Sequence, residues 1–365
     1  MNPALPIRAL GVVGVPLLGV LALALGWNVA DPAVWVVVLM AAILAATVLA
    51  AVHHAEVIAH KVGEPYGSLV LAIAVTVIEV ALIITLVISG GPQTASLARD
   101  TVFAAVMITT TGIVGLSLLV GALRHGAIRF NAEGAGALLA TVTTLAVLCF
   151  VLPNFTSGTD AQFSTSQLVF VAIASLALYA LFVATQTLRH RDFFLPVTPE
   201  GATLREQEHA TPPTRRAALI SLGLLLLSLV AVVGLAKLVS PTIEAGVEAV
   251  GFPGSFVGVV IALLVLLPES IAAVRAARRN RIQTSLNLAL GSAMASIGLT
   301  IPAIAVASFV LDGPLLLGLG TAQMVLLGLT VVVSILTIAP GRATRLQGGV
   351  HLVIFAAFLF LSIAP

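Results

Sequence analysis

The sequence has little charge, few aromatic side chains and a single cysteine. Of its 365 residues only 9% are charged and 5% are aromatic, whereas 59% are hydrophobic. Soluble domains carry roughly 25% charged residues, so a water-soluble fold is excluded. The lone Cys149 excludes an intrachain disulfide and a cysteine metal cluster. The apolar runs do not alternate with polar residues, which excludes a membrane β-barrel.

What the sequence does have is a series of long apolar runs separated by short polar stretches. This pattern is typical of an all-α polytopic membrane protein, and windows of about 20 apolar residues predict about eleven transmembrane helices. The predicted spans are approximately 8–26, 33–55, 66–89, 100–123, 134–152, 166–188, 217–239, 254–275, 284–310, 315–338 and 346–364. We expect the first to be an uncleaved span rather than a signal peptide, because it is near full length.

The basic residues fall almost entirely on one side of these predicted spans. If the N-terminus is cytoplasmic, fifteen Lys and Arg lie in inner loops, and only Arg99 and Lys237 lie in outer loops. Cytoplasmic loops of membrane proteins carry such an excess. The sequence therefore predicts a cytoplasmic N-terminus, and an odd number of spans then puts the C-terminus outside.

The spans also divide into two groups of five. The groups at 33–188 and 217–365 have opposite orientations because five is odd, which is the arrangement of two inverted five-helix repeats. We expect a leading transmembrane helix at 1–32 and a cytoplasmic connector at 189–216. Pro65-Tyr66-Gly67-Ser68 opens the third span and Pro253-Gly254-Ser255 the eighth, so related segments enter the membrane from opposite faces.

Two glutamates lie deep in these related segments, Glu79 in the third span and Glu269 in the eighth. A carboxylate near the bilayer midplane costs about 2.5–3.5 kcal/mol on insertion scales, so such residues are rarely kept without a function. Neither span carries a Lys or Arg at membrane depth that could neutralise its acid. We predict that Glu79 and Glu269 bind a cation and protons.

Polar residues near each glutamate could complete a cation shell. Pro268 cannot donate to the carbonyl of Leu264, and this helix break leaves a backbone oxygen for coordination. Hydroxyls and an amide supply the rest of the predicted set: Thr76, Thr109, Thr110, Ser117, Ser270, Asn287, Ser292 and Ser296. Such stripes in membrane helices also serve close helix packing, and the sequence leaves both roles open.

A histidine-rich segment joins the second and third spans. His53, Glu56 and His60 share helical spacing, and Glu64 follows them. These residues predict either a metal-binding or proton-sensing face at a cytoplasmic entry, or a solvated helix end.

The two glutamate segments resemble a known superfamily. Gly63-Glu64-Pro65-Tyr66-Gly67-Ser68 running into Val77-Ile78-Glu79-Val80, and Leu267-Pro268-Glu269 followed by Asn287-Leu-Ala-Leu-Gly-Ser292, are similar to the paired repeats of the calcium/cation antiporter superfamily. The closest type is the bacterial calcium/proton (sodium-potassium/proton) antiporter of the ChaA type. The resemblance implies one essential glutamate per repeat, carried over to Glu79 and Glu269. It also implies a bacterial inner (cytoplasmic) membrane, with lipid and transported ions as partners and no nucleic acid.

The function expected from these residues is secondary active antiport. Ca²⁺, Na⁺ or K⁺ would leave the cytoplasm in exchange for H⁺ by alternating access at a central two-glutamate site, without a cofactor. Cation and protons would compete for the same two carboxylates. The alternatives are a proton-uncoupled cation channel, an exchanger with a different coupling ion, and an intramembrane hydrolase, which would need a nucleophile or metal at membrane depth.

Overall fold

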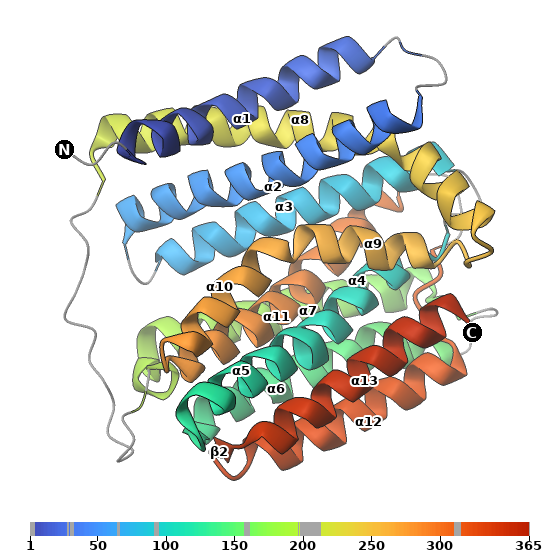
Figure 1. The fold of residues 1–365 in the computed structure, drawn as a ribbon. Coiled ribbons are helices and arrows are strands. Elements are labelled where there is room, and N and C mark those ends of the chain that lie inside the picture. Colours follow the sequence, from blue (N-terminus) through green and yellow to red (C-terminus); the bar gives the residue numbers. More distant parts are fainter. Residues whose placement is uncertain are drawn as a thin grey trace. The chain divides into compact units, whose positions relative to one another are not determined.

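The computed structural model describes residues 4–27, 29, 33–63, 66–90, 95–156, 161–195, 197, 213–309 and 315–364. Helices make up nearly all of them (Figure 1). The α-helices are α1 Ala4–Gly26, α2 Val34–Val62, α3 Tyr66–Gly90, α4 Leu97–Met107, α5 Val114–His125, α6 Ala132–Ala146, α7 Thr165–Ala184, α8 Arg215–Ala249, α9 Phe256–Val265, α10 Leu267–Arg278, α11 Ile282–Ala307, α12 Thr321–Ile338 and α13 Arg345–Ile363.

Several of these helices continue through short stretches of a different helical type. Three π-helices, η2 Ile108–Ile113, η3 Val147–Val151 and η5 Thr185–Arg189, follow α4, α6 and α7, and η2 leads directly into α5. Two 3₁₀ turns are η4 Leu152–Phe155 and η6 Arg191–Phe194. Strands β1 Ile128–Arg129 and β2 Arg342–Ala343 pair antiparallel, and they tie the turn after α5 to the turn after α12.

The helices support the polytopic membrane class. Within the described ranges, eight helices are long and apolar enough to cross a membrane, or nine if the bent pair α9 and α10 is one span. The apolar stretches described in α1 and α3 are shorter, at Val13–Gly26 and Ile73–Thr85. The count of eleven spans and the inverted repeat therefore stay predictions.

Three helix boundaries differ from the predicted spans. α2 runs to Val62 instead of ending near 55, since no residue breaks the helix before Gly63, where φ is 77° and the N–H donates to the Ala59 carbonyl. α8 runs to Ala249 instead of 239 and contains Pro241 within the helix. The predicted span at 315–338 becomes helical only at Thr321, for a reason given below.

The chain forms two compact units. The first holds α1, α2, α3 and α8, and in it α8 packs against each of the other three helices. The second holds α4 to α7 and α9 to α13, with α11 packed against α4, α5, α6, α7 and α10. Each unit takes helices from both predicted repeats, and the division of the chain into repeats stays a prediction.

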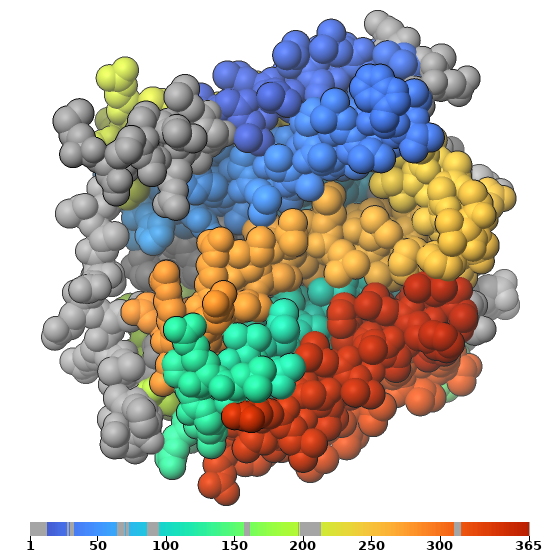
Figure 2. All heavy atoms as spheres, viewed as in Figure 1, coloured from blue at the N-terminus to red at the C-terminus, as the bar shows by residue number. Residues whose placement is uncertain are grey.

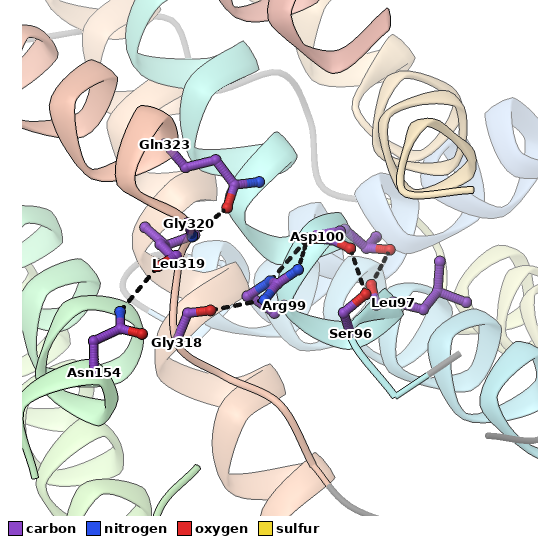
Figure 3. A network of polar contacts seen from close by, with 10 residues as sticks. Ser96, Leu97, Arg99, Asp100, Asn154, Gly318, Leu319, Gly320 and Gln323 are labelled. Carbon is purple, nitrogen blue, oxygen red and sulfur yellow. Dashed lines mark hydrogen bonds and ion pairs between the residues drawn. The ribbon is translucent and has the colours of Figure 1, made fainter. Parts of the chain in front are cut away.

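A non-helical segment, Leu315–Gly320, leads into α12 and is fastened by polar contacts within the second unit (Figure 3). Arg99 Nη1 donates to the Gly318 carbonyl at 2.7 Å, and Asn154 Nδ2 donates to the Leu319 carbonyl at 3.0 Å. The same arginine forms an ion pair with the buried Asp100, which also accepts a hydrogen bond from Ser96. The backbone of this segment thus bonds to other elements instead of to its own next turn, which is why the predicted helical start at 315 is wrong.

Candidate functional site

Glu79 lies midway along α3, in the first unit. Its side chain is only 5% exposed, and Thr76, one turn earlier, is 6% exposed. Ile78, Leu82 and Ile83 on the same helix are also buried, so the carboxyl group stands in an apolar stretch. Burial removes this carboxyl group from bulk water. Its role in cation binding stays a prediction.

Glu269 lies in the second unit at a break between two helices. α9 ends at Val265 and α10 begins at Leu267, with a bend of 55° between them. Glu269 is in the first turn of α10 and is half-buried. The amide groups of a helix N-terminus favour a negative charge, and the C-terminal carbonyls of the preceding helix favour a cation. A break is present, but it lies at Leu266, two residues before Pro268, which stands in the first turn of α10. The Leu264 carbonyl accepts a backbone N–H at the end of α9, and cation coordination by this oxygen stays a prediction.

The hydroxyl of Ser270 forms a hydrogen bond at the same break. Ser270 Oγ donates to the Leu266 carbonyl at 2.7 Å, and the Ser270 N–H donates to the same oxygen at 2.9 Å. Both bonds tie the first turn of α10 to the residue at the bend. Ser270 therefore stabilises the break, and its role as a cation ligand stays a prediction.

Thr109 and Thr110 of the predicted polar set lie in the π-helix η2, between α4 and α5. Short π-helical segments inside α-helices occur frequently at functional sites. Thr109 Oγ1 donates to the Ala105 carbonyl at 2.7 Å, and Thr110 Oγ1 donates to the Val106 carbonyl at 2.6 Å. Because each hydroxyl donates its only proton to a backbone carbonyl, its oxygen can only accept a hydrogen bond from another group or coordinate a cation.

Two further hydroxyls point to a polar interior in the second unit. Ser117 Oγ on α5 and Thr300 Oγ1 on α11 are buried, and neither has a hydrogen-bond partner among the described residues. Ser296, one turn before Thr300, is buried as well, and Ser292 is half-buried. Unsatisfied buried hydroxyls cost free energy unless water or an ion contacts them.

The elements that carry these groups pack against one another. α10 contacts α5, η2 and α11, and α11 contacts both η2 and α5. On the face shown in Figure 2, α5 lies between α10 and α13 and touches both. The second unit therefore places the Glu269 helix against the threonine-bearing π-helix and the serine-bearing α11.

Asn287, predicted as part of the polar set, is engaged elsewhere. Its Nδ2 donates to the Phe194 carbonyl at 2.7 Å, and its Oδ1 accepts from Gln283 Nε2 at 2.9 Å. Gln283 in turn accepts from the Asn131 N–H at 2.7 Å. These bonds fasten η6, at the beginning of the connector, to α11, so Asn287 holds the connector in this structure. Most of the connector, at 198–212, lies outside the described residues.

The histidine-rich segment lies in the last turns of α2. His53, Glu56 and His60 are all exposed, and Glu64 lies outside the described residues. No group of three or more His, Cys, Asp or Glu in the described ranges could hold a metal ion, so the metal-binding interpretation of His53, Glu56 and His60 is not supported. Proton sensing at these residues stays a prediction.

One buried group with two partners was missed by the reading of the sequence. His351 on α13 is 1% exposed, with Nδ1 3.0 Å from the Thr110 carbonyl and Nε2 3.2 Å from Thr337 Oγ1. A single histidine in an apolar helix gives no spacing signal. The clue that could have found it is the rarity of ionisable residues within membrane spans.

The sequence pattern of a known protein family matches most of the chain, in agreement with the fold and with these polar groups. The sequence pattern of the family described as "Sodium/calcium exchanger protein" matches residues 32–188 and 220–364. The chain belongs to the sodium/calcium exchanger protein family. Membership confirms the predicted antiporter superfamily, and it makes this exchanger-family chain an ion transporter, not an enzyme.

Similar proteins agree with this assignment. The exchanger-family chain is 46% identical over 354 residues to an ionic transporter of Sinorhizobium fredii, y4hA, covering 96% of this chain and 95% of that protein. It is 34% identical over 308 residues to the sodium-potassium/proton antiporter ChaA of Escherichia coli, covering 84% and 83%. The solved H⁺/Ca²⁺ exchanger CAX has the same fold, with a TM-score of 0.69 at 16% identity over 98% of this chain and 92% of that one.

Proposed function

We propose that the protein is a cation/proton antiporter that exports Ca²⁺, Na⁺ or K⁺ from the bacterial cytoplasm in exchange for H⁺. The observation that carries this proposal is the position of Glu269, an acid in the first turn of α10 at a 55° break within an apolar span. Discontinuous membrane helices recur at the ion sites of transporters, where carbonyls at the break and half-helix C-termini coordinate cations. A carboxylate next to such a break adds the negative charge that a cation site needs. The 34% identity to an antiporter named for sodium, potassium and protons supports the coupling to protons.

The second carboxylate of the proposed site is Glu79. Like Glu269, it has a hydroxyl within three residues on its own helix, Thr76 on α3 for Glu79 and Ser270 on α10 for Glu269. A hard cation such as Ca²⁺ takes six to eight oxygen ligands. In the proposed site the carboxylates supply the charge, while lone pairs of Thr109 and Thr110, the hydroxyls of Ser117, Ser292 and Ser296, and water complete the shell.

Exchange follows from competition at these two carboxylates. With the cation bound, both glutamates are ionised and act as ligands. When the cation leaves, two bare carboxylates in an apolar environment are unstable, so protons take its place before the site turns to the other face. Because the empty, charged site does not cross, inward movement of protons drives outward movement of the cation by alternating access.

The test is proton movement in proteoliposomes that contain the purified protein and a pH-sensitive dye. Under an imposed proton gradient, Ca²⁺, Na⁺ and K⁺ are added separately to the wild type, Glu79→Gln and Glu269→Gln. We expect at least one cation to move protons in the wild type. In each variant this movement falls to the level of empty liposomes, since an amide cannot exchange a cation for a proton.

Glu248→Gln is the matched control, because Glu248 is an exposed glutamate near the end of α8. It should transport like the wild type, and the folding of all variants is checked by their elution as single species in detergent. Cation flux without proton movement would support a channel or a different coupling ion. Full activity of both glutamine variants would sink the two-glutamate site.

A further inference from the structure

The histidine on α13 lies where the π-helix needs a hydrogen-bond donor. In η2 the Val114 N–H bonds to the Thr109 carbonyl, five residues back, and from α5 onward the α-helical pattern connects each N–H to the carbonyl four residues back. The Gly115 N–H therefore bonds to the Thr111 carbonyl. Between these two bonds, the Thr110 carbonyl receives no N–H from its own helix. His351 Nδ1 lies 3.0 Å from this oxygen.

The chemistry of this contact fixes the protonation of the ring. A carbonyl oxygen can only accept, so Nδ1 must carry the proton that it donates to Thr110. In the neutral imidazole, Nε2 then accepts from the hydroxyl of Thr337 on α12, 3.2 Å away. Both nitrogens are thereby satisfied in a side chain that is 1% exposed.

We propose that His351 is a positioning residue that holds η2 in its π-helical register through the Thr110 carbonyl, and so sets the positions of the Thr109 and Thr110 oxygens for cation binding. This inference rests on the proposed function, in which those oxygens belong to the cation shell. The contacts of η2 with α10 and α11 carry the effect toward the Glu269 helix. His351 itself does not touch the cation.

Two amide substitutions separate the two hydrogen bonds of the imidazole. The side-chain nitrogen of asparagine reaches the position of Nδ1, so His351→Asn keeps a donor for the Thr110 carbonyl and loses the Thr337 contact. Glutamine reaches the position of Nε2, so His351→Gln keeps the Thr337 contact and loses the donor to Thr110. Both side chains are polar and smaller than or similar to the ring, which makes them a matched pair for folding.

We expect the two variants, His351→Asn and His351→Gln, to differ in their apparent KM for the transported cation. His351→Gln should raise this KM about threefold to tenfold, the effect of one lost buried hydrogen bond, with the maximal rate nearly unchanged. His351→Asn and Thr337→Val should stay near the wild-type KM. Equal KM values for the asparagine and glutamine variants would overturn the proposal.

Hydrogen–deuterium exchange gives a readout that does not depend on transport. Amides of residues 112–116 should exchange faster in His351→Gln than in the wild type and His351→Asn, because the π-helix loses its external donor. Unchanged exchange in the glutamine variant would overturn the role of His351. If the wild type moved no protons, the proposed function would be wrong. The hydrogen–deuterium exchange data would still test whether His351 holds the Thr110 carbonyl. If wild-type transport depended on Glu269 but His351→Asn and His351→Gln had the same apparent KM, only this inference would be wrong.

Discussion

At the scale of single residues, two glycines, Gly115 and Gly348, set how closely α13 approaches α5. A Cβ at Gly115 would lie 2.9 Å from the Cβ of His351, and a Cβ at Gly348 would lie 2.5 Å from the Leu119 backbone nitrogen. A Cβ at Gly112 would touch the ring of Phe355 at 3.4 Å. Small residues allow membrane helices this degree of contact. The close approach of α13 therefore requires glycine at 115 and 348, whereas a Cβ at 112 would make an ordinary contact.

Gly348→Ala should destabilise the protein. The new methyl group would meet backbone atoms of Leu119, which cannot move aside as a flexible side chain can, so we expect a cost of about 1–3 kcal/mol and a lower Tm in detergent. Gly349→Ala is the neighbouring control, with no atom within 4 Å of the added Cβ, and its Tm should stay equal or rise because alanine favours the helix. Equal losses in both variants would contradict the close packing of α13 on α5.

Whether a site residue can be predicted from the sequence depends on how far its contact partner lies along the chain. Glu79 and Glu269 stood out because a charge within an apolar run is visible without any partner. His351 is 241 residues from Thr110, so no local spacing relates them. The contact of Asn287 was hidden for the same reason, since its hydrogen bond runs to Phe194, 93 residues away.

At the scale of elements, the break between α9 and α10 is the feature that the sequence predicted best, because a proline in a membrane span removes a backbone donor at a known position. The π-helix η2 could not be foreseen. Its Ile-Thr-Thr-Thr-Gly-Ile segment fits an α-helix equally well, and the donor that contacts the Thr110 carbonyl comes from a distant helix. The non-helical Leu315–Gly320 escaped detection because its bonds are likewise to distant elements.

Pro268→Ala should weaken cation binding. An amide at position 268 restores a backbone donor beside the bend, which favours a straighter helix and displaces the first turn of α10, where Glu269 lies. We expect the apparent KM for the cation to rise about tenfold, the effect of one charge-assisted contact. Pro241→Ala serves as the control because Pro241 is an exposed proline inside α8. The KM is measured in proteoliposomes, and an unchanged value for Pro268→Ala would argue against a role for the break.

At the scale of the whole molecule, composition and loop charge predicted the membrane class, while helix lengths and register were set by contacts the sequence does not reveal. Labelling of single cysteines measures sidedness, and the lone Cys149 makes this simple. Its thiol is buried beside Ser175, so the wild type should resist a membrane-impermeant maleimide.

Single cysteines at exposed positions then report orientation. Thr321→Cys, at the start of α12, should be labelled in intact cells, whereas Arg279→Cys, after α10, should be labelled only after the membrane is opened. This result follows from the excess of basic residues in the predicted inner loops. The opposite labelling pattern would reverse the predicted topology.

The fastening of Leu315–Gly320 has a consequence for biogenesis. Arg99 and Asn154 precede their carbonyl acceptors by 219 and 165 residues, so both donors leave the ribosome long before Gly318 and Leu319. Chains are made from the N-terminus, and their parts fold as they emerge. Docking of α12 and α13 is then the last assembly step of the second unit. A nascent chain that stalls before this segment keeps Arg99 without its carbonyl acceptor and β1 without β2, and it presents those unfinished surfaces to the proteases that survey membrane proteins.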